Sequence, residues 1–262
     1  MKLLSTVISM LVCLGAAFPA ERQSPGYAAY ERANAFFIVQ KYPESRSAID
    51  EALRLDAKLF PALTLKAKLA MAMNRFNVAR ESLDLAVKAE PGSGYAQFLY
   101  GMAYFLTNDL QLAEPHFDAA RRLDKRDARA VLYLGLTRES LGKPTEALSL
   151  YEESVGIKAQ PESLLAGARQ LLLMGRLEEA EHWTTRALTL DPKSRDSHFE
   201  LARLLLKRGD PKAAQEGEIA LGLSGGTVSD SQIHYLLIGA YRVSNPSKSA
   251  AHAEALRAIE PN

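Results

Sequence analysis

Five histidines are the side chains of this sequence best suited to bind a metal or to act as a general base. They are His116, His182, His198, His234 and His252. A helical zinc-protease motif has two histidines four residues apart with a glutamate beside the first, and the sequence contains no such pair. The histidines also fall at different positions of the internal repeat described below. We therefore interpret each as an ordinary helix residue and expect no bound metal.

Paired carboxylates, glycine-rich turns and the single cysteine offer no better route to catalysis. Glu152-Glu153 and Glu178-Glu179 are adjacent in sequence, so on a helix they point in different directions instead of converging on one substrate. Gly92-Ser93-Gly94 and Gly225-Gly226 lack the preceding strand that a phosphate loop or a nucleophile elbow requires. Cys13 lies in a segment that we expect to be removed. The sequence predicts a protein that is not an enzyme and has no cofactor.

The overall charge is close to neutral. The chain of 262 residues has 32 basic and 31 acidic side chains, a net charge of +1. So small an imbalance gives no general attraction to nucleic acid or to an anionic membrane surface. We expect no nucleic-acid partner.

The N-terminus has the pattern of an export signal. Met1-Lys2 gives a positive start, a mostly apolar stretch continues to Leu14, and Gly15 and Ala17 are small. This predicts a signal peptide of residues 1–17 (alternatively 1–20) and a linker of residues 18–25. The apolar stretch is shorter than the roughly 20 residues of a membrane-spanning helix. An uncleaved anchor and a lipid on Cys13 stay open, although Val12 is an unusual residue before a lipidated cysteine. We expect a periplasmic or secreted protein that meets a membrane only through this segment.

Along the rest of the chain, small residues fill all but three places of three parallel series with a step of 33 to 35 residues. The series are Ser45, Ala79, Ala113, Ala147, Ala180, Ala214, Ser249; then Ala33, Ala67, Gly101, Gly135, Ala168, Ala202, Leu237; and Ala52, Ala86, Ala120, Ser154, Ala187, Leu221, Leu256. Small side chains are needed where helix axes approach to about 8–10 Å. The step therefore indicates repeated pairs of antiparallel helices that bury their apolar faces on one another.

Turn-forming residues support this interpretation. Gly142, Gly175 and Gly209 fall midway through their units, where glycine suits the left-handed end of a first helix. Pro144 and Pro211 suit the start of a second helix. No segment alternates polar and apolar residues for long, so we expect no sheet.

The pattern closely resembles the tetratricopeptide repeat, in the form found in exported bacterial proteins. The best matches are Tyr100-Gly101-x-x-Tyr104…Ala113…Phe117…Ala120, Leu134-Gly135…Ala147…Tyr151 and Gly175…Ala180…Ala187-Leu188…Leu190-Asp191-Pro192. The resemblance implies an all-α, right-handed α-solenoid of about seven helix-turn-helix repeats over residues 26–262. The predicted units are 26–59, 60–93, 94–127, 128–160, 161–194, 195–229 and 230–262.

The resemblance also implies that positions 2, 5, 9, 12 and 13 of each unit line a concave groove that binds a partner. In the first units these positions carry mainly aromatic and apolar residues: Tyr27, Tyr30, Asn34, Phe37, Tyr95, Phe98, Met102 and Phe105. Large apolar side chains on an open wall indicate a binding surface. A register error of one residue would instead place them in the core, and this alternative stays open.

The later units give the groove a mildly basic wall. Its predicted residues are Arg129, Arg169, Phe199, Arg203, Lys207, Tyr241 and Arg242, with His234 among them. Arginine is well suited to hold a carboxylate of a partner. Acidic residues such as Glu139, Glu162 and Asp196 share this wall, and the mixed signs favour the simpler interpretation, a solvated face.

These observations predict a non-catalytic scaffold that binds a protein or peptide segment outside the cytoplasm, for assembly of an envelope or secretion complex. A carbohydrate-binding cell-wall or polysaccharide-export factor is one alternative. A regulatory subunit of an envelope enzyme is another. The last helix has no following repeat to cover it, so it could also join two copies of the chain into a homodimer.

Overall fold

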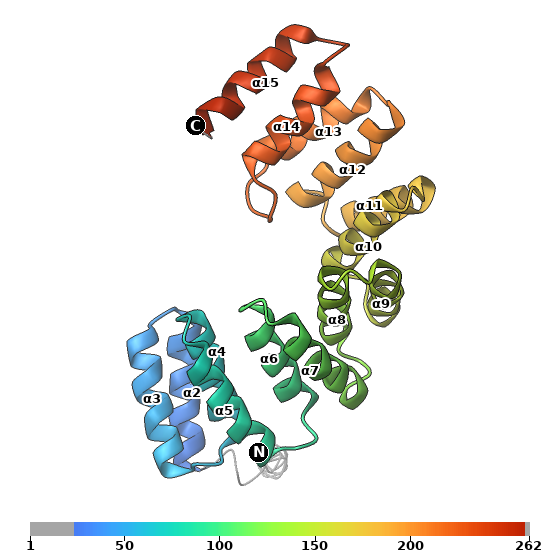
Figure 1. The fold of residues 1–262 in the computed structure, drawn as a ribbon. Helices are drawn as coiled ribbons and strands as arrows, with labels where there is room; N and C mark the ends of the chain where they lie inside the picture. The colour runs from blue at the N-terminus through green and yellow to red at the C-terminus, as the bar shows by residue number, and fades with distance from the viewer. Residues whose placement is uncertain (1–23, 260–262) are drawn as a thin grey trace, which may run out of the picture. The chain divides into compact units, whose positions relative to one another are not determined.

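The computed structural model describes residues 24–259, and this range contains fourteen α-helices and no strand (Figure 1). The predicted all-α fold class is therefore confirmed. The predicted signal peptide, both of its cleavage points, Cys13 and residues 260–262 lie outside the described part of the chain. No helix between residues 24 and 259 has both the length and the hydrophobicity to cross a bilayer.

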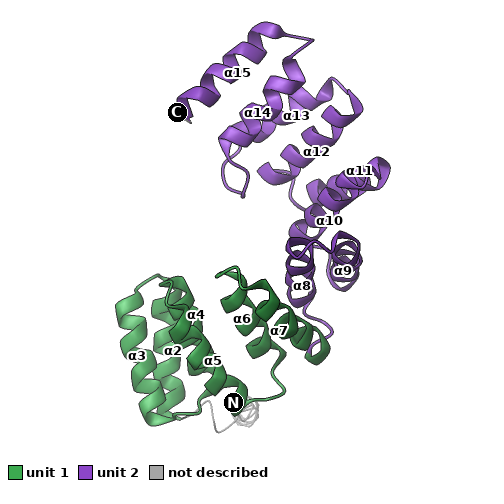
Figure 2. Cartoon of the chain, viewed as in Figure 1, with its two compact units in different colours: residues 1–123 green, residues 124–262 purple. Residues whose placement is uncertain are grey.

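The helices form two compact units that divide after Leu123 (Figure 2). The first unit contains α2 (Pro25–Ile38), α3 (Tyr42–Leu55), α4 (Phe60–Ala72), α5 (Phe76–Ala89), α6 (Gly94–Phe105) and α7 (Leu110–Leu123). The second contains α8 (Ala128–Ser140), α9 (Pro144–Ile157), α10 (Pro161–Leu173), α11 (Leu177–Leu190), α12 (Arg195–Arg208), α13 (Lys212–Gly222), α14 (Asp230–Tyr241) and α15 (Pro246–Ile259).

Consecutive helices pair as hairpins, from α2 with α3 to α14 with α15. The first helix of a hairpin also packs on the first helix of a neighbouring one: α2 on α4, α4 on α6, α10 on α12, and α12 on α14. Helix α2 begins at Pro25, one residue before the first predicted unit. The exact limits of the repeat units stay a prediction.

A left-handed residue closes the first helix in six of the seven hairpins. These residues are Gln40, Asn74, Asn108, Gly142, Gly175 and Gly209, with φ between 55° and 76°. The prediction for the three glycines is thus confirmed. Left-handed backbone is tolerated by asparagine and free of steric cost for glycine, which accounts for five of the six turns; Gln40 is the exception.

Serine begins several of the first helices. The Oγ atoms of Ser24, Ser93, Ser194 and Ser229 accept hydrogen bonds from backbone N–H groups in the first turns of α2, α6, α12 and α14. Each bond satisfies a donor that the helix itself leaves unpaired. The local sequence therefore fixes where these helices start.

The small-residue series lie at the helix contacts, and all of their members are buried except Ser249, Leu221 and Leu256. Three hairpins show how close the approach is. A Cβ atom on Gly101 would lie 2.6 Å from the ring of Phe117, and one on Gly135 would lie 2.6 Å from the ring of Tyr151. In the same way, Gly167 faces Trp183. An aromatic ring of each second helix thus lies directly on a glycine of its first helix.

Candidate functional site

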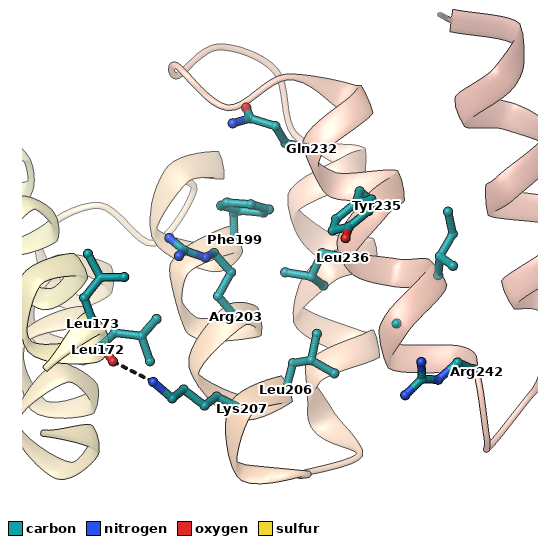
Figure 3. A pocket seen from close by; sticks show the side chains of 12 residues that line it. Leu172, Leu173, Phe199, Arg203, Leu206, Lys207, Gln232, Tyr235, Leu236 and Arg242 are labelled. Atoms are coloured by element: carbon teal, nitrogen blue, oxygen red, sulfur yellow. Dashed lines mark hydrogen bonds between the residues drawn. The ribbon is translucent and has the colours of Figure 1, made fainter. Parts of the chain in front are cut away.

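A cleft of about 520 Å³ lies in the second unit along the first helices of its last three hairpins (Figure 3). Seven apolar or aromatic residues from α10, α12 and α14 line it: Leu172, Leu173, Phe199, Leu206, Tyr235, Leu236 and Ile238. Leu173 and Tyr235 are 68% and 75% exposed, so large apolar groups face solvent here. A volume of this size is typical of ligand-binding pockets. We call it the α10–α12–α14 cleft.

Three cationic side chains also line this cleft, and none of its twelve lining residues is acidic. The Lys207 ammonium donates a hydrogen bond to the backbone carbonyl of Leu172 at 2.9 Å (Figure 3). The Arg203 guanidinium pairs with Glu200 at 2.8 Å. Arg242 is exposed, and within residues 24–259 its side chain has no ion-pair or hydrogen-bond partner. The cleft therefore presents positive charge beside an apolar wall.

Glu200 lies behind the cleft and is only 5% exposed. Burial raises the pKa of its carboxyl group, and the nearby charges of Arg203 and Arg169 oppose that rise. The Arg203 guanidinium also lies 5.9 Å from the centre of the Phe199 ring. Two neighbours thus hold Arg203 at the edge of the cleft, which reduces the entropy it would lose on binding an anion.

Four of the residues predicted for the basic wall meet in this cleft: Phe199, Arg203, Lys207 and Arg242. Arg129 does not line it. Arg129 makes a two-pronged ion pair with Asp127 at 2.8 and 2.9 Å, at the start of α8. Arg169 is half-buried, and its charge acts on Tyr151 and Glu200.

Tyr241 and His234 point toward the last helix and do not line the cleft. The Tyr241 ring stacks on His252 of α15, and its hydroxyl donates to Glu218 of α13 at 3.0 Å. Helix α14 instead contributes Gln232, Tyr235, Leu236, Ile238 and Gly239 to the cleft, and Arg242 follows directly after the helix.

Sequence reasoning missed seven cleft residues: Leu172, Leu173, Gln232, Tyr235, Leu236, Ile238 and Gly239. A signal for the two leucines was present, because they occupy positions 12 and 13 of the fifth predicted unit. No comparable signal existed for Tyr235, which lies at position 6 of its unit. One residue on a helix corresponds to a rotation of about 100°, so an error of one position moves a side chain to another face.

The first unit carries a smaller hollow on α2, α4 and α6, of about 170 Å³. Three predicted groove residues line it: Tyr30, Asn34 and Tyr95. Phe60, Pro61, Thr64, Leu65 and Lys68 complete the lining. The first helices of the first unit thus also form a recess of mixed aromatic and polar character.

The other predicted residues of the first unit lie beside this hollow or in the core. Tyr27 contacts the Tyr30 ring edge-on at 5.3 Å, and the Lys68 ammonium lies 5.0 Å from the Phe37 ring. Phe98 is 7% exposed and packs on Phe117, so it belongs to the core.

Phe105 also packs on Phe117, at 6.2 Å between ring centres. It is half-buried, as is Met102. The core alternative that the sequence left open therefore applies to Phe98, and in part to Phe105.

No group of three or more histidine, cysteine, aspartate or glutamate side chains in the described range is arranged to hold a metal ion. The arrangement on the first helices is that of a surface with apolar and charged contact groups.

Comparison with known proteins agrees with the architecture of repeated helical hairpins. The model of the tetratricopeptide repeat family matches residues 64–125, 107–163 and 165–226, more than half of the chain. The protein belongs to the tetratricopeptide repeat family, whose members generally act as non-catalytic scaffolds for protein interactions.

Three similar proteins illustrate the range of the family. Anaphase-promoting complex subunit 3 of Schizosaccharomyces pombe is 23% identical over 197 residues, which are 74% of this chain but only 29% of that protein. The chain therefore spans less than a third of this relative. The structure of Pseudomonas aeruginosa PilF superposes with a TM-score of 0.68 and 18% identity, over 78% of this chain and 92% of PilF.

YrrB, described as a tetratricopeptide protein with an unusual peptide-binding site, superposes with a TM-score of 0.52 and 18% identity. The match covers 68% of this chain and 92% of YrrB. At these identities the likeness of PilF and YrrB concerns the fold alone.

Proposed function

We propose that this protein is a non-catalytic scaffold that holds a segment of a protein partner on the first helices of its hairpins. The segment lies in the α10–α12–α14 cleft, and the partner belongs to an envelope or secretion complex outside the cytoplasm. The observation that carries the proposal is the cleft itself, where exposed apolar side chains lie beside cations and no lining residue is acidic.

The chemistry of the cleft favours a segment that combines an apolar side chain with a carboxylate. Leu173 and Tyr235 expose apolar surface that gains free energy when a partner covers it. Arg242 has its donors free to form a two-pronged hydrogen bond with a carboxylate, which is stronger than a bond between neutral groups. The hollow lined by Tyr30 and Tyr95 offers a second point of contact. The peptide-binding site described for YrrB supports this use of the fold.

Location outside the cytoplasm is supported by the N-terminal sequence. The positive start, the short apolar stretch and the small residues before Ala17 fit an export signal. Fusion of residues 1–25 to an alkaline phosphatase reporter, which is active only outside the bacterial cytoplasm, tests this part. We expect active reporter and a processed N-terminus after Ala17 or Ala20. Inactive reporter would contradict export.

A screen of random peptides against the full chain tests binding. We expect enrichment of peptides that contain a large apolar residue next to aspartate or glutamate. Their affinity, measured by fluorescence anisotropy, should fall about tenfold or more in Arg242→Glu and in Tyr235→Ala, a loss of about 1.4 kcal/mol or more. Both side chains are exposed, so the changes leave the fold intact.

Two matched variants serve as controls. Lys212→Glu reverses an exposed charge on α13, and Leu190→Ala removes an exposed apolar side chain on α11. Neither residue lines the cleft, so both variants should bind like the unmodified chain. Enriched peptides without acidic residues, or equal losses in the control variants, would show that the cleft is not the binding site.

A further inference from the structure

The last helix, α15, is attached to its neighbours mainly through polar contacts. None of its residues from Pro246 to Ile259 is buried. Burial of apolar surface is the main source of helix docking energy, and in α15 it comes only from half-buried residues such as Ala253 and Leu256. The Ser249 hydroxyl donates to the backbone carbonyl of Ile238 at 2.9 Å. The remaining polar contacts concentrate in one cluster of titratable side chains.

Two histidines face each other at the centre of this cluster. His234 of α14 and His252 of α15 approach with 3.0 Å between their Nδ1 atoms, a hydrogen-bonding distance. Such a bond needs a proton on one nitrogen and a lone pair on the other. When both rings are cationic, both Nδ1 atoms carry a proton and the bond cannot form.

Charged groups from three helices surround the pair. Glu218 of α13 lies 3.4 Å from Nε2 of His252 and accepts a hydrogen bond from Tyr241. Lys248 of α15 lies 3.2 Å from the Tyr241 hydroxyl and 3.8 Å from Glu218. Asp230 of α14, which pairs with Arg195 of α12, also acts on His234. Glu218 can therefore pair with a positive ring of His252. A second proton, on His234, would place two positive rings against each other.

We propose that the His234–His252 contact is a proton-sensitive clasp, which holds α15 on α14 while at most one of the two rings is protonated and releases it when both are. When both rings are protonated, the hydrogen bond between them is lost and two positive charges face each other at the same distance. Because α15 has no buried residue, only half-buried side chains, the Ser249 hydrogen bond and the contacts of Lys248 and His252 with α13 and α14 oppose its release.

The direction of the pH effect follows from the surroundings of His234. Burial, and then the charge of His252, lower the pKa of His234 below its ordinary value of 6.5, although Asp230 and Glu218 act in the opposite sense. A histidine whose pKa is lowered by docking stabilises the docked state above the undocked pKa. Docking is therefore strongest above about pH 6.5 and weakens as the pH falls from there through the lowered pKa.

Release of α15 would also change the surroundings of the candidate site. Leu256 of α15 lines a second hollow together with Phe199, Arg203 and Tyr235, all of which also line the α10–α12–α14 cleft. Acidification would thus remove one wall beside the cleft. This consequence for binding rests on the proposed function, whereas the release itself does not.

Hydrogen exchange of the full chain at pH 7.5 and pH 5.5, corrected for the intrinsic pH dependence of exchange, tests the clasp without any partner. At pH 5.5 carboxylates stay ionised while ordinary histidines are protonated. We expect peptides from α15 to exchange about tenfold faster at pH 5.5, the size of effect expected from one lost hydrogen bond. Peptides from α9 should keep their protection.

Substitutions identify the groups responsible. His234→Gln and His252→Gln each leave at most one titrating ring of the pair, so the acceleration of α15 exchange at pH 5.5 should be abolished in His234→Gln and clearly reduced in His252→Gln, where the burial of His234 still acts. His182→Gln is the matched control, because His182 is exposed on α11 and should leave the response unchanged. Equal protection of α15 at both pH values in the unmodified chain would overturn the proposal. So would an undiminished response in both glutamine variants of the pair, or equal loss of protection in α9.

Discussion

Replacing Gly135 with alanine tests whether close contact of helix and ring holds the hairpins together. The new Cβ atom would lie 2.6 Å from Cε1 and 2.9 Å from Cδ1 of Tyr151. To restore an ordinary contact of 3.4 Å, the ring must retreat by about 0.8 Å (3.4 − 2.6). Tyr151 is 0% exposed and its hydroxyl is bonded to Glu139, so it has little room to move.

The magnitude follows from two opposing effects. Overpacking in a filled core costs about 1–3 kcal/mol. Alanine in place of a helical glycine returns about 0.5–1 kcal/mol. We therefore expect Gly135→Ala to lower the free energy of unfolding by about 1 kcal/mol.

Gly156 provides the matched control on the other helix of the same hairpin. Nothing lies within 4 Å of a Cβ atom at this position, and the residue is exposed. Gly156→Ala should therefore stabilise the protein by up to about 1 kcal/mol. The two variants differ mainly in the contact with Tyr151, so their free energies should differ by about 2 kcal/mol.

Urea denaturation followed by circular dichroism measures this difference, provided that both variants unfold with the same slope. A double variant, Gly135→Ala with Tyr151→Leu, should show no additional loss relative to Tyr151→Leu alone, because the clashing ring is gone. If Gly135→Ala proved as stable as Gly156→Ala, the close-contact explanation for glycine at this position would be wrong.

Two further predictions concern buried polar groups. Ser154→Ala should lower the free energy of unfolding by about 1–2 kcal/mol. The buried Oγ of Ser154 donates a hydrogen bond to the carbonyl of Ala128 at 2.9 Å and lies 2.8 Å from the Oγ of Ser163. Ser149 is exposed, and Ser149→Ala should change the free energy of unfolding by less than about 0.5 kcal/mol in the same urea assay. Glu200→Gln should become more stable relative to the unmodified chain as the pH rises above about 4.5, since a carboxyl whose pKa is raised by burial loses stability when it ionises. Denaturation midpoints of both chains between pH 4 and pH 7 measure this trend, and parallel curves would contradict it.

Local sequence determined the helical hairpins of this protein. Turn residues such as Asn108 and Gly142 adopt the left-handed conformation that ends a first helix, and serine caps begin several of the first helices. The regular step of small residues predicted which positions would be buried, because only compact side chains fit where helix axes are closest. The resemblance to the tetratricopeptide repeat implied a common groove face for Phe199, Arg203 and Lys207, and side chains four residues apart on a helix are indeed neighbours.

Tertiary structure alone decided which of these side chains form a site. Tyr241 turns to His252 and Glu218, and Tyr235 takes its place in the cleft. Arg129 is engaged by Asp127, whereas Arg242 has no partner in residues 24–259. Sequence spacing sets a residue's position along a helix and its approximate face. The final direction of a long side chain depends on the residues that neighbouring helices bring beside it, and these are distant in sequence.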